Sequence, residues 1–526
     1  MSQIAPHATP PNPTGRQPAR SGLRGVLDGL ATTRRGIAEA LVEAWSVRAV
    51  RRGMLGTLLI AIGSLTPAFL PDNSPWWNVL RAPGLIWVLS RVLTVLALLG
   101  ILLVMDCWFS LRPRPGSPKV NYRAVLFLWS LPMLMAPPIF SHDAYAYAAE
   151  GYMIIVGANP YEMGPGMLGG RWAEQVAGDW RFTRAPYGPL DLRLNELVVR
   201  LFAESPYWSA SLGMRLLTGL GLVSVAATLP DLARRLRIDP KKAMWFGLLN
   251  PLTITHLVGG AHNDAVMLGF ISLALYLAIR GRFLIACALI AAATAVKLPG
   301  ILAIVPVALL ALPIRNRAEK RFPELVQAGW RVALGTAITV IAFVFITLAC
   351  NLGWGWIQAI NVPGMVITIS PSTMLGEFLR GVLNLFGQYR LALGVTRIVR
   401  IIGMVIMVLV ILYFLVRDAP RRPMRFLVLS FIALALGGPA LHPWYLTWAA
   451  AFLAFARPSS TFVRMASWAS IMLLSYSAVS YTWRNDLLAV GIAAIAAFAW
   501  IIWGNDRTHF REPKFEPPLE NPVVKG

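Results

Sequence analysis

Five short blocks of the sequence place ionisable or aromatic side chains at the edges of long apolar runs. In the first block, Ser141 can cap a helix and Asp143 lies in the first turn, where the macrodipole favours a negative charge. Asp143, Tyr147 and Glu150 follow i, i+4, i+7 spacing and therefore share one helical face. Asp143 is either a dipole partner only or a general base at the membrane boundary, beside His142.

The second block contains two turns that are rich in glycine and proline, at residues 157–165 and 185–190. Such turns are rigid, and we expect them to present Tyr161 and Tyr187. These rings can pack on a sugar or on lipid, or they can belong to an interfacial aromatic belt.

The third block, residues 257–265, sets His262, Asn263 and Asp264 between two apolar runs. An Asn or Asp cap at a helix start explains one of them, but three polar groups exceed what one cap requires. One histidine and one aspartate in this block fall short of a metal site.

Lys297 interrupts an apolar run from Phe283 to Leu312. A lysine in the bilayer centre costs roughly 2.5–3.5 kcal/mol, so its ammonium must snorkel to the surface or bind an anion. Pro299 and Gly300 predict a break that divides the run into two short helices, with Lys297 at their outer turn. A flexible ammonium suits the phosphate of a lipid substrate.

The fifth block contains His442, which precedes a proline and is therefore expected in extended backbone. Trp444 and Tyr445 follow it at positions typical of interface anchors. The imidazole can bind a phosphate or a sugar hydroxyl, although an isolated histidine is more often structural.

Composition indicates the elements that must position these residues. The chain has 526 residues, of which 56% are hydrophobic and 14% charged, and a mean hydropathy of +0.60. A soluble chain carries roughly a quarter charged residues, so we predict an all-α, multi-pass membrane protein with about fourteen spans, some short or broken. The predicted spans lie near 54–71, 85–110, 123–139, 208–229, 243–258, 265–279, 283–296, 298–312, 330–350, 395–416, 425–439, 444–456, 462–481 and 487–503.

Lysine and arginine set the orientation of these spans. Basic residues fill the connections 111–123, 230–242, 313–331 and 417–425, all on one side of the span list, which is therefore predicted to be cytoplasmic. The net charge of +23 fits this pattern, and no nucleic-acid-binding motif is evident. An even span count puts both termini in the cytoplasm, and all five blocks fall on the outer side, as one shared pocket would require.

The predicted organisation has three parts. Residues 54–503 form a transmembrane catalytic domain with two long structured outer loops, 140–207 and 351–389. Residues 504–526 form a cytoplasmic tail, and residues 1–53 form another, without a cleavable signal peptide. Residues 23–45 of that first tail are either an amphipathic helix on the anionic membrane surface or disordered. The three cysteines are expected to be buried free thiols.

Together these blocks resemble a known family. His-Asp-Ala-Tyr-Ala-Tyr-Ala-Ala-Glu-Gly, Gly-Ala-Asn-Pro-Tyr, Ala-Pro-Tyr-Gly-Pro-Leu, Gly-Gly-Ala-His-Asn-Asp, Ala-Val-Lys-Leu-Pro-Gly and His-Pro-Trp-Tyr-Leu-Thr-Trp are similar to motifs of the actinobacterial polyprenol-phosphate-mannose-dependent α-1,6-mannosyltransferases. The similarity extends from about residue 50 to 505. That family belongs to the GT-C class of multi-pass enzymes with an active site on the outer face of the plasma membrane.

The resemblance implies a lipid-linked mannose donor and a mannan acceptor of lipomannan or lipoarabinomannan. Asp143 matches the family's acidic residue and would deprotonate the acceptor 6-hydroxyl, with inversion at the anomeric carbon. Lys297 and His442 would stabilise the departing phosphate. The block 262–264 would bind sugar hydroxyls or orient the base. No Asp-X-Asp pair is evident in the outer loops, which is consistent with a lipid co-substrate and with no metal or other cofactor.

Two alternatives stay open at this point. A transporter or flippase of lipid-linked saccharides would use the same charges for binding without chemistry. A GT-C transferase for another sugar, such as arabinose, would share the architecture, and only the resemblance favours mannose. The variant Asp143→Asn separates the first alternative, because a carrier should continue to move its substrate.

Overall fold

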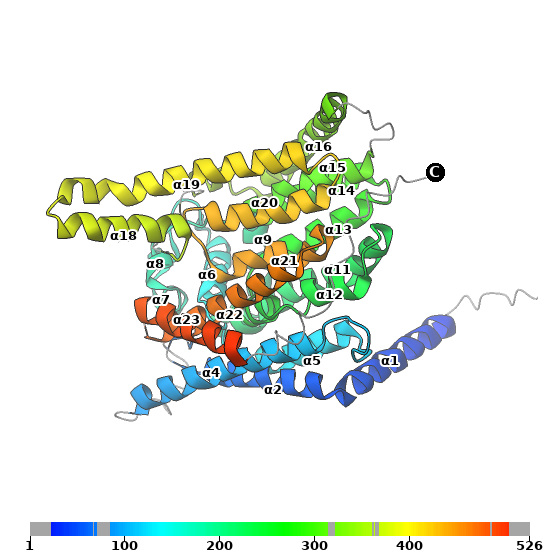
Figure 1. The fold of residues 1–526 in the computed structure, drawn as a ribbon, viewed down its shortest axis with the longest axis horizontal. Coiled ribbons are helices and arrows are strands. Elements are labelled where there is room, and N and C mark those ends of the chain that lie inside the picture. Colours follow the sequence, from blue (N-terminus) through cyan, green and yellow to red (C-terminus); the bar gives the residue numbers. More distant parts are fainter. Residues whose placement is uncertain are drawn as a thin grey trace, which may run out of the picture.

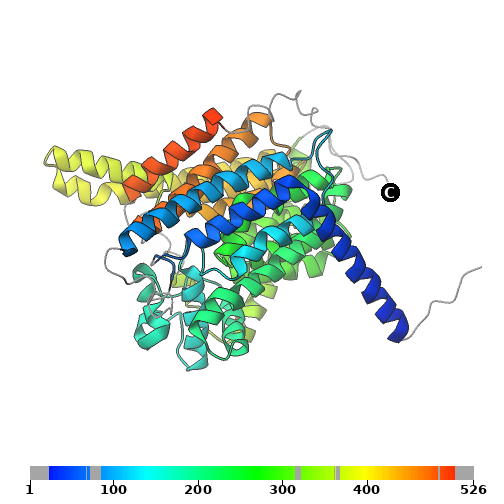
Figure 2. The same cartoon turned by 90° about the horizontal axis from the view of Figure 1, so that it is seen from below.

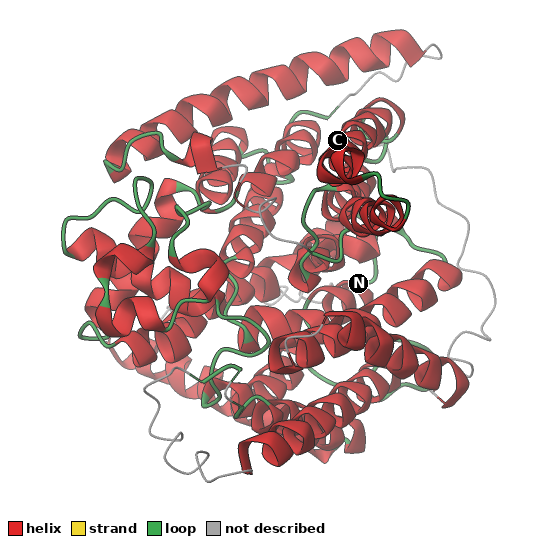
Figure 3. Cartoon of the chain, turned by 90° about the vertical axis from the view of Figure 1, so that its left-hand side faces the viewer, coloured by secondary structure: helices red, strands yellow, loops and turns green. Residues whose placement is uncertain are grey.

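The computed structural model describes residues 23–66, 68–70, 85–313, 321–359, 362, 368–483 and 486–503. Within these ranges the regular structure is entirely helical, and Figure 3 shows helices and loops without a strand. The predicted tails 1–22 and 504–526 lie outside the described residues, as do residues 314–320 of one predicted basic loop.

Most long helices run roughly along one direction, and shorter helices gather at one end of the bundle (Figure 1). In chain order, the α-helices are α1 (Leu23–Ser46), α2 (Arg48–Gly63), α4 (Leu85–Ser110), α5 (Tyr122–Leu134), α6 (Asp143–Ile155), α7 (Gly170–Glu174), α8 (Gly178–Arg181), α9 (Pro189–Leu201), α10 (Pro206–Trp208), α11 (Met214–Arg235), α12 (Pro240–Gly247), α13 (Asp264–Ala278), α14 (Phe283–Val296), α15 (Ile304–Ala311), α16 (Arg321–Cys350), α17 (Trp356–Ala359), α18 (Pro371–Leu385), α19 (Tyr389–Arg417), α20 (Pro423–Gly437), α21 (Leu446–Phe452), α22 (Ser460–Trp483) and α23 (Asp486–Trp503). Short 3-10 or π segments are η1 (Pro165–Leu168), η2 (Ser209–Gly213), η3 (Thr253–Gly259), η4 (Leu298–Ala303), η6 (Pro443–Tyr445) and η7 (Leu453–Ala456).

Several of these helices are long and apolar enough to cross a bilayer. Five described helices meet that criterion, and a sixth span is possible if the bent pair η3–α13 counts as one. Further apolar helices of 10–17 residues lie among them. Every predicted apolar span falls on a helix or on a pair of short helices. The protein is therefore a multi-pass membrane protein.

Two of the predicted basic loops lie at the same end of the bundle. Arg421, in the turn between α19 and α20, lies 2.9 Å from the buried carboxylate of Glu324 at the start of α16. At the opposite end, α6, α7 and α8 lie close together, at the left of Figure 1. In Figure 2, the first part of α1 projects from the bundle, and residues 23–46 form a helix, which is one of the two alternatives that the sequence left open.

Small residues allow the central helices to approach closely. A Cβ added to Gly221 of α11 would lie 2.1 Å from the carbonyl oxygen of Ala265 in α13. On α2, a Cβ at Gly63 would lie 2.6 Å from the carbonyl oxygen of Leu93. Small residues at crossings are typical of membrane helices, where close packing replaces the hydrophobic effect between helices. The contact at Gly221 fixes the start of α13, which begins with Asp264 and directly follows the predicted site residues His262 and Asn263.

Breaks in the helices bring polar residues to one place. The pair η3–α13 bends by 111°, and the bend contains residues 260–263. The second break lies where we expected it, because α14 ends at Val296 and Lys297 is extended, with φ −149° and ψ 128°, before the 3-10 segment η4. The two breaks meet, because the ammonium of Lys297 donates to the side chains of Asn263 and Asp264.

The buried side chain of Arg215 in α11 connects these broken segments. Its guanidinium donates to the carbonyls of Ala136 and Pro137, which precede α6, and to those of Val258 and Gly259 at the end of η3. Backbone carbonyls outside a helix need a partner when water is excluded, and an arginine fork offers five donors. Arg215 therefore fixes the loop before Asp143 against the bend that carries His262.

Candidate active site

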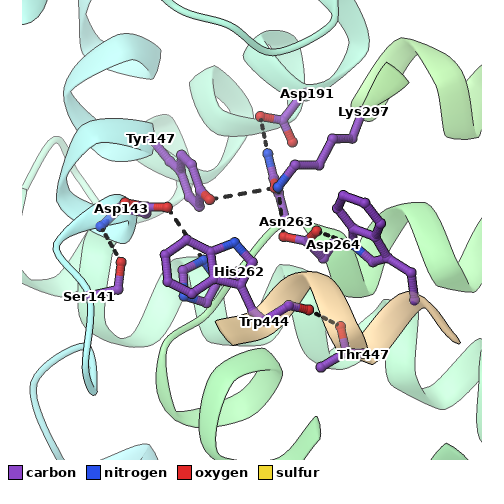
Figure 4. Close-up of polar contacts among 11 residues, drawn as sticks. Ser141, Asp143, Tyr147, Asp191, His262, Asn263, Asp264, Lys297, Trp444 and Thr447 are labelled. Carbon is purple, nitrogen blue, oxygen red and sulfur yellow. Dashed lines mark hydrogen bonds and ion pairs between the residues drawn. The ribbon is translucent and has the colours of Figure 1, made fainter. Parts of the chain in front are cut away.

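The candidate site lies where α6, the bend before α13, the end of α14 and the segment around η6 meet (Figure 4). These segments are distant in sequence, yet each contributes a buried polar or aromatic side chain. The site therefore depends on the packing of the whole bundle.

Asp143 begins α6 and is 7% exposed. Its backbone amide donates to the Ser141 hydroxyl at 3.0 Å, but the residue that precedes the helix is His142, so Ser141 is not the helix cap that we expected. Its Oδ2 atom lies 3.5 Å from Nδ1 of His262, at the long limit of a hydrogen bond. The carboxylate and the imidazole thus face each other across the junction between α6 and α13.

A stack of rings continues from this carboxylate. The indole of Trp444 stacks on His262 at a centroid distance of 3.8 Å and on His442 at 4.6 Å. His256 lies 5.9 Å from His262, also ring to ring. Three imidazoles therefore surround one indole beside Asp143, and two of them were predicted site residues.

The surroundings of Asp143 keep it ionised. Burial on its own raises the pKa of this carboxyl group, but the hydrogen bond and the charge of His262 outweigh that effect. With smaller contributions from His442 and Lys297, the pKa falls to about 2. For His442, burial lowers the pKa to about 4, so this imidazole is neutral near pH 7. Asp143 is therefore negatively charged near pH 7.

Lys297 anchors the second half of the site. Its ammonium lies 2.8 Å from Oδ2 of Asp264 and donates to Oδ1 of Asn263 at 3.3 Å. The other Asp264 oxygen accepts from the indole of Trp448. Asn263 in turn donates to Asp191 at 3.0 Å. The lysine charge is thus held by a buried acid rather than by simple snorkelling to the surface.

Aromatic rings flank the ammonium of Lys297. It lies 5.3 Å from the ring centre of Tyr445 and 5.8 Å from that of Tyr187. Tyr187 packs edge-on against Tyr147 at 5.0 Å, and Tyr445 stacks on Trp448 at 4.5 Å. Cation–π contacts stabilise the charge without occupying its hydrogen bonds. Within the described residues, the only hydrogen bonds from this ammonium go to Asp264 and Asn263, which leaves one N–H for a ligand.

Buried polar atoms without a partner concentrate at this site. Among the described residues, no hydrogen bond reaches Oε2 of Glu150, Oδ1 of Asp191, Nε1 of Trp444 or either ring nitrogen of His256. Leaving such groups unpaired costs roughly 1–3 kcal/mol each, so native proteins usually pair them. Their concentration beside Asp143 and Lys297 indicates a place where hydroxyl or phosphate oxygens bind.

Two predicted residues lie elsewhere. His142 is directed away from the neighbouring Asp143, and its Nε2 contacts the carbonyl of Ala68 while its ring packs edge-on against Tyr145. The hydroxyl of Tyr161 donates a hydrogen bond to the carbonyl of Tyr187 at 2.8 Å, so Tyr161 contacts the site through the backbone of Tyr187. The remaining predicted residues converge, including Glu150, which is 4% exposed on the same face of α6 as Asp143.

Three further residues, Asp191, His256 and Arg215, were not among the predicted site residues. Asp191 is fully buried, and burial raises its pKa to about 7, although bonds from Asn263 and Asn195 oppose that rise. It directly follows the Ala-Pro-Tyr-Gly-Pro-Leu block, so its position at a helix start was a usable signal. His256 and Arg215 lie inside apolar runs, where an ionisable residue in a span is itself a functional signal.

The residue types at this site suit oxygen ligands more than a structural metal. In the described part of the chain, no group of three or more His, Cys, Asp or Glu side chains is arranged to hold a metal ion. The described cysteines, Cys107, Cys287 and Cys350, are buried and free, as expected. A buried carboxylate opposite an ammonium, with aromatic rings between, can bind and activate a polar substrate that carries an anionic leaving group.

Comparison with known proteins identifies the family. Residues 50–313 match the model of the α-(1→6)-mannopyranosyltransferase N-terminal domain, and residues 372–503 match that of the MptB C-terminal domain. A probable α-(1→6)-mannopyranosyltransferase of Mycolicibacterium smegmatis is 30% identical over 77% of this chain and 78% of its own length. An α-(1→6)-mannopyranosyltransferase A of Mycobacterium tuberculosis is 28% identical over 86% of this chain and 89% of its own.

The similarity extends to a further genus. The α-(1→6)-mannopyranosyltransferase A of Corynebacterium glutamicum is 28% identical over 76% of this chain and 86% of its own length. No solved structure matches. The fold and site define a multi-pass membrane glycosyltransferase. More particularly, the chain belongs to the α-(1→6)-mannopyranosyltransferase family, which decides against the transporter alternative.

Proposed function

We propose that the protein transfers mannose from polyprenyl phosphate mannose to the 6-hydroxyl of an α-1,6-mannan chain of lipomannan or lipoarabinomannan. The observation that supports this most is the buried pairing of Asp143 with His262 on one side of the site and of Lys297 with Asp264 on the other (Figure 4). A base and a phosphate-binding cation are the two charges that such a transfer requires.

In the proposed reaction, the acceptor O6 attacks the anomeric carbon while the bond from that carbon to the phosphate oxygen breaks. The electron pair of that bond leaves with the polyprenyl phosphate, and the hydroxyl proton passes to Asp143. A β-linked donor gives an α-linked product in this single displacement. Because glycosyl transfer passes through an oxocarbenium-like state, the attacking oxygen becomes acidic late, and a carboxylate with a low pKa still accepts its proton.

Phosphate departure requires positive charge rather than a strong acid. The free N–H of Lys297 and the neutral imidazole of His442 are the proposed contacts to the leaving phosphate. Asn263 and Asp191 would bind mannose hydroxyls, since both lie beside Lys297 and Asp191 keeps one oxygen unpaired. A nucleotide or metal is not part of the proposed mechanism.

The proposed orientation puts this site at the outer face of the plasma membrane. We propose fourteen spans, with both termini in the cytoplasm and the outer loops 140–207 and 351–389 around the site. The Arg421–Glu324 pair supports a shared cytoplasmic end for two basic loops. Cysteine accessibility at exposed positions tests this: Arg171→Cys in α7 should react with an impermeant maleimide on intact cells, and Lys241→Cys should react only after lysis.

The activity is tested with membranes, labelled polyprenyl phosphate mannose and short α-1,6-mannosides. Asp143→Asn should lower product formation by roughly 10²–10⁴-fold, the usual contribution of a general base. Asp179→Asn is the matched control, because Asp179 is an exposed acid in the same outer loop. Equal turnover by wild type and Asp143→Asn would remove the proposed base. Labelled polyprenyl phosphate arabinose, offered in parallel, tests the remaining alternative sugar.

A further inference from the structure

A cleft lies outside the cluster around Asp143. It has a volume of about 280 Å³ and is formed between the first outer loop and residues 352–358. Its lining is mostly polar or aromatic, and the side chains that matter here are Asn159, Tyr161, Glu162, Arg184, Trp354 and Gln358. None of these side chains belongs to the Asp143–Lys297 cluster.

Specific contacts hold the two walls of this cleft together. The amide of Asn159 donates to the carbonyl of Leu352 at 3.2 Å, and the guanidinium of Arg184 donates to the side-chain oxygen of Gln358 at 2.9 Å. Gly355 approaches Tyr161 so closely that an added Cβ would lie 2.4 Å from the tyrosine Cβ. The cleft is therefore a built feature and not a gap between loosely packed loops.

The chemistry of the lining fits a saccharide. Trp354 is 43% exposed and offers an aromatic face to the C–H surface of a sugar ring. Around it, a carboxylate, a guanidinium and two amides, those of Glu162, Arg184, Asn159 and Gln358, provide planar groups that bind adjacent hydroxyls. The volume is near the lower end of the roughly 300–1,000 Å³ of small-molecule sites, which suits a short segment of an oligosaccharide.

A short connection joins this cleft to the candidate active site. Tyr161 lines the cleft, and its hydroxyl donates to the carbonyl of Tyr187 at 2.8 Å. The ring of Tyr187 lies beside Lys297 and against Tyr147. A chain that reacts beside Asp143 therefore passes close to the cleft. The second wall, residues 352–358, falls between the two segments that match the family models.

We propose that this cleft binds an internal sugar residue of the mannan acceptor, remote from the residue that receives the new mannose. The inference rests on the proposed function, because it takes the acceptor to be an α-1,6-mannan. Such a remote subsite would let the enzyme prefer longer acceptors without changing the reacting groups.

Acceptor length is the variable that tests the subsite. The variants Trp354→Ala and Arg184→Ala should raise KM for an α-1,6-mannohexaose roughly tenfold, as expected when one anchoring contact is lost. KM for the disaccharide and kcat for both acceptors should not change, because the shorter acceptor does not reach the cleft. Arg171→Ala is the matched control, an exposed arginine on α7 of the same loop, and should behave as wild type at every length.

Three outcomes would overturn the proposal. The first is an unchanged KM at all acceptor lengths. The second is an equal loss for short and long acceptors, which would mean that the residues act on the catalytic cluster through Tyr161. The third covers failure of the proposed function itself: if wild type transfers to no mannoside, mannohexaose is titrated calorimetrically into wild type and Trp354→Ala, and equal heats would exclude the cleft as a saccharide site.

Discussion

The pairing of Lys297 with Asp264 permits a test that separates a structural lysine from a functional one. The Asp264 side chain is fully buried and that of Lys297 is 13% exposed. Lys297→Met would leave a buried carboxylate to which, among the described residues, only the Trp448 indole donates a hydrogen bond. Breaking a buried pair in this way costs about 3–5 kcal/mol, so the single variant should melt at a lower temperature.

A double variant removes the charge mismatch. In Lys297→Met/Asp264→Asn no charge is left unpaired, and the amide oxygen can still accept from Trp448. We expect most of the lost stability to return, because replacing both partners of a buried pair is often nearly neutral. Activity should remain roughly 10²–10³-fold below wild type, the usual loss when one donor to a developing negative charge is removed.

The assay combines a thermal unfolding measurement in detergent with transfer from labelled donor to an α-1,6-mannoside. The control pair is Arg280–Asp231, an ion pair of 3.0 Å whose side chains are 41% and 24% exposed. Removing it as Arg280→Met/Asp231→Asn should change the melting temperature little, because exposed ion pairs stabilise a protein only weakly, and should leave turnover unaltered. If the Lys297→Met/Asp264→Asn protein recovers wild-type turnover together with its stability, Lys297 serves only the fold and the proposed phosphate contact is wrong.

Three further perturbations test the framework. Arg215→Lys should destabilise the protein by about 1–3 kcal/mol or more, because an ammonium cannot reach all the carbonyls that the guanidinium binds; a melting curve as stable as wild type would contradict this bracing role. Gly221→Leu should lower both folded yield and turnover by displacing the start of α13, whereas Gly219→Leu, with no atom within 4 Å of an added Cβ, should not, as gel filtration of the solubilised proteins would reveal. Burial raises the folded-state pKa of Asp191 to about 7, so the folded state binds more protons than the unfolded state between about pH 4 and 7, and stability falls as pH rises through that range. Asp191→Asn should flatten this decline, and parallel wild-type and variant pH–stability profiles would refute it.

Much of the site could be predicted because charge is rare in this sequence. Lysine and arginine residues in the connections predicted which connections lie on the cytoplasmic side of the membrane. The blocks around Asp143, His262, Lys297 and His442 were all predicted to lie on the opposite side. Their meeting in one cluster follows from that shared side. The helix break at Lys297 was also foreseeable, since proline and glycine follow it directly.

Other features depend on tertiary contacts that leave little trace in the sequence. His142 and Asp143 are adjacent, yet successive side chains at a helix start diverge, and the imidazole of His142 is directed to the carbonyl of Ala68, a contact that the sequence does not indicate. The predicted loop 351–389 contains α18, which pairs antiparallel with α19 as a helical hairpin (Figure 1). The helix α19 begins before the predicted span 395–416, because Arg390 interrupts the apolar pattern near the start of the helix.

The guanidinium of Arg215 has a consequence for how this enzyme can vary. From within a spanning helix, its side chain connects the loop that precedes Asp143 to the bend that carries His262. The same side chain therefore positions the reacting groups and holds the helices of the bundle together. Substitutions that weaken the packing of the helices should misalign the reacting groups before the protein unfolds. We therefore expect such substitutions to lower turnover more than they lower the melting temperature.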